Sequence, residues 1–186
     1  MAHGKIDALP DASLMKRVAE GDSIAFRQLA NRHLDRAHNI ALRVLHNRED
    51  AEEAVQDAMA KVWRKAPTFD PERSAFSTWF YRILTNAALD KLRRRPPPAD
   101  DIDLMGDTLA DLVETGEDAW ARQGEARRIR DAIARLPPQQ RVAVVLCYYE
   151  DFTQPEAASI MDIHLKALEG LLFRAKSSLR RSIAHD

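Results

Sequence analysis

Side chains able to bind nucleic acid form one face of a helix expected over residues 75–95. On a helical projection the aromatic and aliphatic residues share one side. The opposite side has no acid and runs into Arg94 and Arg95; it carries Thr78, Arg82, Thr85, Asn86, Leu89 and Arg93. Guanidinium, amide and hydroxyl groups donate to phosphates and base edges. The face predicts DNA or RNA contact, and the alternative is a solvated face with a basic last turn.

The loop over residues 68–75 supplies an aromatic ring and small hydroxyl groups beside that face. An unpaired base outside the duplex is recognised by stacking and by hydrogen bonds to its edges. Phe69 and Ser74 are suited to these two tasks. A plain interhelical loop, with Phe69 folded onto the core, fits the sequence equally well.

A second candidate DNA-binding face lies on the helix expected over 165–181. Its apolar side is predicted to be buried and consists of Leu165, Leu168, Leu171, Leu172, Ala175 and Leu179. The outward side carries Lys166, Gly170, Phe173, Arg174, Ser177, Arg180 and Arg181. In a helix-turn-helix the early turns face base edges and later basic residues meet phosphates. Lys166, Gly170 and Phe173 are therefore placed near bases, and Arg174, Lys176, Arg180 and Arg181 near the backbone. Exposed Phe173 keeps open a helical hairpin packed on another protein.

The helix expected over 49–65 has the opposite polarity. Acids and one amide follow one side, namely Glu49, Asp50, Glu53, Gln56 and Asp57. Such a face repels phosphate and suits a basic protein groove. A simple solvent-facing surface is the alternative.

Apolar periodicity predicts an all-helical protein. Four N-terminal helices are expected over 12–20, 24–45, 49–65 and 75–95, the first two capped by Asp11 and Ser23. Further helices are expected over 119–135 and 138–149. Thr153 and Glu156 have capping-box spacing and open a short helix to about Met161. A tight turn, 162–164, then leads into a helix ending near Ile183, which completes a helix-turn-helix pattern.

Charge and proline place a linker between two domains. The 186 residues carry a net charge of −1, but 99–121 hold eight acids and no base. The segment 96–118 begins with three prolines and lacks a long apolar period. We therefore expect domains at 1–95 and 119–186, and fully extended the linker spans roughly 75 Å.

Several function classes are disfavoured. The chain shows neither an apolar run of membrane-spanning length nor a signal-peptide core, which predicts a cytoplasmic protein without membrane insertion. Cys147 is the single cysteine, the six histidines lack ligand spacing, and no catalytic constellation stands out. We expect no metal, cofactor or enzymatic activity. A stand-alone helix-turn-helix regulator and a small helical enzyme are the competing classes.

Two long segments resemble one family in order and spacing. DAEEAVQDAMAKVWRKAPTFDPERSAFSTWFYRILTNAALDKLRRR at 50–95 resembles region 2 of the extracytoplasmic-function (ECF) sigma factors. LPPQQRVAVVLCYYEDFTQPEAASIMDIHLKALEGLLFRAKSSLRR at 136–181 resembles their region 4. The resemblance implies a subunit that binds core RNA polymerase and directs promoter-specific initiation.

The resemblance also implies residue roles. The residues that the resemblance implies bind the clamp of the polymerase's largest subunit are Asp50, Glu53, Gln56 and Asp57. The residues that the resemblance implies recognise and open the −10 element are Arg73, Ser74, Phe76, Trp79, Arg82, Asn86, Arg93, Arg94 and Arg95. The acidic linker would thread the polymerase's RNA channel. An anti-sigma factor is the implied inhibitor, with the free chain a monomer or bound one to one.

Region 4 would read the −35 element as duplex, but this chain departs from the family's commonest pattern there. Asp162 replaces the usual turn glycine, and His164 replaces a Ser or Thr cap. The usual basic-polar-basic start of the recognition helix reads Glu169-Gly170-Leu171. Asp tolerates a left-handed turn, whereas His is a poorer cap. Glu169 accepts from a cytosine amino group or faces solvent.

Overall fold

The computed structural model describes residues 9–94 and 127–184. The whole predicted linker (96–118), the N-terminal half of the helix expected over 119–135, and Arg95 lie outside these residues. The described residues contain helices and no strand, which confirms the predicted all-α class.

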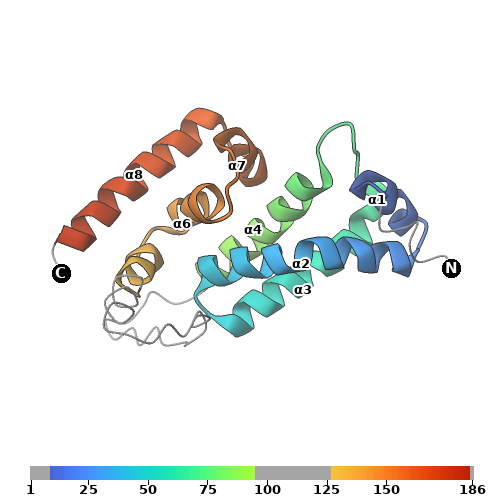
Figure 1. Cartoon of the computed structure of the whole chain (residues 1–186), viewed down its shortest axis with the longest axis horizontal. Coiled ribbons are helices and arrows are strands. Elements are labelled where there is room, and N and C mark those ends of the chain that lie inside the picture. Colours follow the sequence, from blue (N-terminus) through green and yellow to red (C-terminus); the bar gives the residue numbers. More distant parts are fainter. Residues whose placement is uncertain (1–8, 95–126, 185–186) are drawn as a thin grey trace, which may run out of the picture.

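Four helices form an N-terminal bundle (Figure 1). They are α1 (Asp11–Ala19), α2 (Ser23–Leu45), α3 (Arg48–Lys65) and α4 (Phe76–Arg94), with the short helix η2 (Ala66–Thr68) after α3. Their apolar faces meet in one core, in which Leu29, Ile40 and Phe80 are fully buried. Removing this apolar surface from water is the main force that holds the four helices together.

Two N-cap predictions are wrong by one residue. Asp22, not Ser23, caps α2, and its carboxylate accepts from the backbone N–H groups of Ile24 and Ala25. Pro10 precedes α1, so Asp11 is its first residue. At the start of α2 the sequence has two adjacent polar residues, Asp22 and Ser23, and only the backbone conformation decides which one caps.

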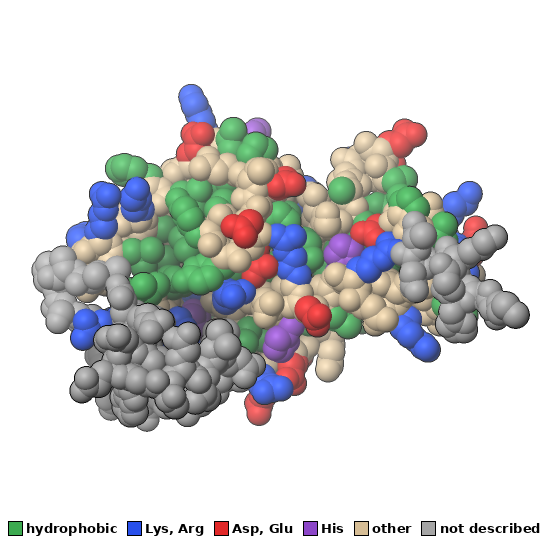
Figure 2. Space-filling view, in the orientation of Figure 1, with side chains coloured by type: hydrophobic (Ala, Val, Ile, Leu, Met, Phe, Trp, Pro, Cys, Tyr) green, Lys and Arg blue, Asp and Glu red, His purple; other side chains and the backbone are tan. Residues whose placement is uncertain are grey.

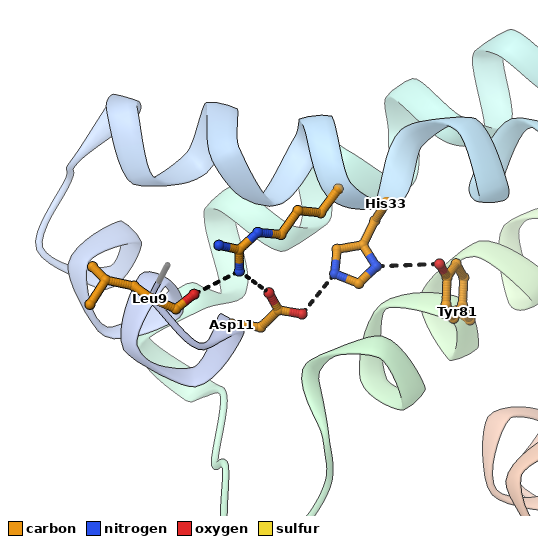
Figure 3. A network of polar contacts seen from close by, with 5 residues as sticks. Leu9, Asp11, His33 and Tyr81 are labelled. Carbon is orange, nitrogen blue, oxygen red and sulfur yellow. Dashed lines mark hydrogen bonds and ion pairs between the residues drawn. The ribbon is translucent and has the colours of Figure 1, made fainter. Parts of the chain in front are cut away.

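Asp11 instead joins a polar network between helices (Figure 3). Its carboxylate accepts from Arg32 Nη1 and His33 Nε2, each at 2.7 Å, and Arg32 Nη1 also donates to the Leu9 carbonyl. His33 Nδ1 lies 3.3 Å from the Tyr81 hydroxyl. In the tautomer that carries its proton on Nε2, His33 donates to Asp11 and accepts from the Tyr81 hydroxyl at Nδ1. The network joins α1, α2 and α4.

Burial of Tyr81 has a testable consequence. Desolvation raises the pKa of its phenol from 10.0 to about 12. Between these values the unfolded chain has lost the proton and the folded chain has kept it, so we expect stability to fall by about 1.4 kcal/mol per pH unit. Denaturant titrations across this alkaline range should show a weaker decline for Tyr81→Phe, and an equally steep decline in that variant would contradict the assignment.

The remaining helices form a C-terminal unit (Figure 1). Residues 127–134 are helical, followed by α6 (Pro138–Val144), the π-helical segment η3 (Val145–Tyr149), α7 (Gln154–Met161) and α8 (Leu165–Ala184). Arg141 is 8% exposed and donates to carbonyls of Ala134, Leu136 and, across in α2, Val44. The unit also packs on the bundle through α7 against α4.

The capping box of α7 is confirmed. Thr153 Oγ1 accepts from the Glu156 backbone, and the Glu156 carboxylate accepts from the Thr153 backbone at 2.9 Å. We expect Thr153→Val to destabilise the C-terminal unit by about 1 kcal/mol, because one N–H at the helix start loses its partner. Urea unfolding measures this loss. Ser177→Ala at an exposed position of α8, in the same unit, provides the control, and an equal effect of this variant would argue against a specific cap.

Candidate polymerase-binding and promoter-binding surfaces

The acidic face of α3 is presented to solvent. Glu53, Gln56 and Asp57 are exposed, and Asp50 is half-buried. Lys91 of α4 lies 2.7 Å from a Glu53 oxygen and 3.7 Å from an Asp50 oxygen. These ion pairs hold the N-terminal part of the acidic face, at Asp50 and Glu53, against α4. Asp57 lies one turn beyond Glu53 and adds negative charge away from Lys91.

Aromatic rings pack together where the 68–75 loop enters α4. Phe69 contacts the Trp79 ring at a centroid distance of 5.2 Å and the Phe76 ring at 6.1 Å. Phe76 is 3% exposed, and Trp79 and Phe69 are half-buried. The loop therefore adopts the alternative in which Phe69 covers the core. Arg73 is exposed and Ser74 half-buried, so the polar part of the loop faces outward.

The polar face of α4 is less open than the sequence predicts. Asn86, Arg93 and Arg94 are exposed, but Thr85 is only 1% exposed, so its predicted exposure is wrong. One turn earlier the Tyr81 ring contacts Phe152 of the C-terminal unit at 5.5 Å. Helices α6 and α7 pack on α4. A helical projection cannot show that another part of the chain covers the face.

Arg82 lies where α4 meets the helix-turn-helix. Its guanidinium donates to the Ser159 carbonyl at 2.8 Å and pairs with Asp162 at 3.2 Å. Asp162 has φ +56°, the left-handed conformation predicted for this turn. The proposed DNA-reading arginine is thus already engaged by the C-terminal unit.

Helix α8 presents a cationic face. Its outward residues are exposed except half-buried Gly170; they are Lys166, Glu169, Phe173, Arg174, Lys176, Arg180 and Arg181. Phe173 is 76% exposed. Figure 2 shows basic and hydrophobic side chains gathered over this end of the molecule. A Cβ on Gly170 would lie 3.4 Å from the Arg174 guanidinium, which folds across the bare glycine. Leu165 is exposed, contrary to prediction, since the first residue of α8 precedes its packed face.

The residues that join the two parts of the chain could not be identified from the sequence alone. Glu150 pairs with Arg36 and Arg43, more than 100 positions away, and no local spacing reveals such partners. Burial raises the pKa of Glu150, and the two arginines oppose that rise. Cys147 is half-buried and free, and burial raises the pKa of its thiol. Each described helix is too short or too polar to traverse a bilayer.

Comparison with known proteins extends these observations. Sigma-70 region 2 matches residues 29–96, and Sigma-70 region 4 matches residues 126–179. ECF sigma factor SigM of Mycobacterium tuberculosis is 32% identical, covering 94% of this chain and 85% of its own. The ECF sigma-E factor of Haemophilus influenzae is also 32% identical, and the match covers 95% of this chain and 97% of that protein.

A solved structure supports the same match over both parts of the chain. CnrH in complex with the cytosolic domain of CnrY is 27% identical, with a TM-score of 0.70, and covers 95% of this chain and 98% of its own. The matched relatives are sigma factors, which are transcription initiation factors rather than enzymes, and this places the helical bundle and the helix-turn-helix in that class. The chain belongs to the ECF RNA polymerase sigma factors. Such factors bind core RNA polymerase and promoter DNA.

Proposed function

We propose that the two parts of this sigma factor divide promoter recognition between them. Residues 1–95 bind core polymerase and open the −10 element, 96–118 connect the parts, and 119–186 read the −35 element. The observation that carries this proposal is the separation of charge: α3 presents carboxylates, whereas α8 presents Lys166, Arg174 and further cations. One face repels phosphate and the other attracts it.

The α3 face docks on the clamp of the largest polymerase subunit. The acidic character and exposure of Glu53, Gln56 and Asp57 support this role. Asp50 supports the face through Lys91. A basic partner surface would be attracted to these carboxylates and oriented by them.

The start and outer edge of α4 recognise the −10 element. Exposed Arg73, Asn86, Arg93 and Arg94 are available for DNA, and Arg95 follows them in the sequence. Trp79 and Ser74 contribute stacking and hydrogen bonding to an extruded base. Because Phe76 is buried, we assign it the support of Phe69 and Trp79 rather than direct contact.

Helix α8 enters the major groove of the −35 element. Lys166, Glu169, Gly170 and Phe173 lie on its early turns, next to base edges. Arg174, Lys176, Arg180 and Arg181 follow, and we assign them phosphate contacts. Because Gly170 has no side chain, the Arg174 guanidinium can lie close to the helix at that position.

An anti-sigma factor in the cytoplasm is the proposed inhibitor. CnrH, similar to this chain, was solved in complex with the cytosolic domain of CnrY. Large apolar side chains are exposed among the described residues, and they are Ile24, Trp63, Tyr148, Tyr149, Leu165 and Phe173. Such side chains suit a protein partner that covers them. We propose a monomer that forms a one-to-one complex.

Run-off transcription with purified core enzyme on a panel of promoters tests the proposal. We expect promoter-specific transcripts only when both core enzyme and this chain are present. Tight duplex binding by the chain alone, without any stimulation of core enzyme, would favour a self-sufficient regulator. Initiation unaffected by deletion of α8 would refute the assigned −35 role.

A further inference from the structure

A buried carboxylate of the C-terminal unit lies among arginines of the N-terminal bundle. Glu150 is 8% exposed, and its oxygens lie 2.6 Å from Arg43 Nη1 and 3.3 Å from Arg36 Nε. Arg36 also donates to the Glu150 carbonyl. Two arginine side chains of α2 thus bind both the carboxylate and the backbone carbonyl of Glu150.

Aromatic side chains extend this contact. The Arg36 guanidinium lies 3.9 Å from the centre of the Phe152 ring, which meets Tyr81 of α4 edge to face. Arg43 lies 5.1 Å from the Tyr149 ring. Cations over ring faces are attracted by the ring quadrupole, most strongly where water is excluded. The 149–152 segment is therefore docked on α2 and α4 by several mutually supporting contacts.

A second contact engages the promoter-facing side of α4. Arg82 binds Ser159 and Asp162 at the turn of the helix-turn-helix. Thr85, one turn further, is 1% exposed, and its hydroxyl donates to the Arg82 carbonyl. The cationic face of α8, by contrast, stays exposed.

We propose that these two contacts form an autoinhibitory latch, in which the C-terminal unit withholds Arg82 of α4 from the −10 element while α8 remains accessible. The latch consists of Glu150 with Arg36 and Arg43, together with Arg82 with Asp162. The inference rests on the function proposed above for Arg82. It assigns regulation of that site to the chain itself, before any inhibitor binds.

Promoter geometry requires the latch to open. The two elements are centred about 25 base pairs apart, which is about 85 Å along duplex DNA at a rise of 3.4 Å. In the closed chain Arg82 lies 3.2 Å from the turn before α8. The 32 residues over 95–126 reach about 105 Å when extended, enough to span both elements. Simultaneous binding therefore excludes the closed arrangement.

Charge reversal at Glu150 tests the latch in the full-length chain. Glu150→Arg places a third cation beside Arg36 and Arg43, so we expect a larger radius of gyration by small-angle X-ray scattering. Affinity for single-stranded −10 oligonucleotides, measured by fluorescence anisotropy, should rise about 10-fold, because Arg82 becomes accessible beside the already exposed Asn86. Arg43→Glu breaks the contact from α2 and should expand the particle as well.

Two matched variants control for charge. Asp35→Arg adds the same charge to an exposed position of α2 beside the latch, and it should change neither size nor affinity by more than about twofold. Combining Arg43→Glu with Glu150→Arg keeps the net charge of the wild type and should return the radius toward its wild-type value. Circular dichroism verifies that each variant retains its helices.

The possible outcomes separate the latch from the proposed function. An unchanged radius in both Glu150→Arg and Arg43→Glu would overturn the latch. Expansion without a gain in oligonucleotide affinity above the Asp35→Arg control would overturn the masking of Arg82. If the variants expand as expected but neither they nor the wild type support run-off transcription, the latch stands and the proposed function fails.

Discussion

A chain carrying Glu53→Lys and Asp57→Lys should keep its helices and lose core RNA polymerase. Both side chains are exposed on α3, so their replacement leaves the core of the bundle intact. Two lysines facing a basic docking groove convert attraction into repulsion, and like charges across an interface cost several kcal/mol. We expect affinity for core enzyme to fall about 100-fold or more. Co-purification and fluorescence titration with labelled core enzyme measure the loss.

The control must change charge equally away from α3. Glu20→Lys with Asp35→Lys does so at exposed positions of the same bundle, and we expect this pair to retain near-normal affinity. Asp57→Lys alone is also informative, because it avoids placing a new cation beside Lys91, which pairs with Glu53. Full affinity in the double α3 variant, with helicity unchanged, would contradict the clamp assignment.

Local sequence patterns predicted the helices and their turn chemistry. Thr153 and Glu156 act across three residues, and Asp162 adopts its left-handed conformation within one turn. The exposed position of Phe173 likewise follows from helical periodicity alone. These features depend on neighbours within about one helical turn, so spacing in the sequence contains the necessary information.

The contacts between the two parts of the chain lay beyond such patterns. Arg36 and Arg43 appear as ordinary polar positions of an amphipathic helix, and Glu150 as a loop acid after an apolar run. Their pairing depends on tertiary packing, which also buries Thr85 on the side of α4 predicted to face solvent. Periodicity identifies a polar face, but it cannot distinguish solvent from another polar surface as its neighbour.

Replacing Arg82 and Asn86 together by alanine should abolish promoter opening while leaving −35 binding intact. Arg82 leaves the latch to contact DNA in the proposed open state, and Asn86 is exposed one turn further along α4. Each lost polar contact to DNA costs about 1–3 kcal/mol, so we expect opening to fall about 100-fold. Permanganate reactivity of unpaired thymines in the holoenzyme complex measures opening, and binding to −35 duplex provides the parallel readout.

Arg82 has two roles in this proposal, and Asp162→Asn separates them. Asparagine tolerates the left-handed turn at this position and removes only the carboxylate that pairs with Arg82. If Arg82 acts on DNA, this variant opens promoters at least as well as the wild type, although it weakens the same latch contact as Arg82→Ala. Equal loss of opening in Asp162→Asn and in the double alanine variant would instead mean that the contact between α4 and the turn is needed for activity, and the assigned DNA role of Arg82 would be wrong.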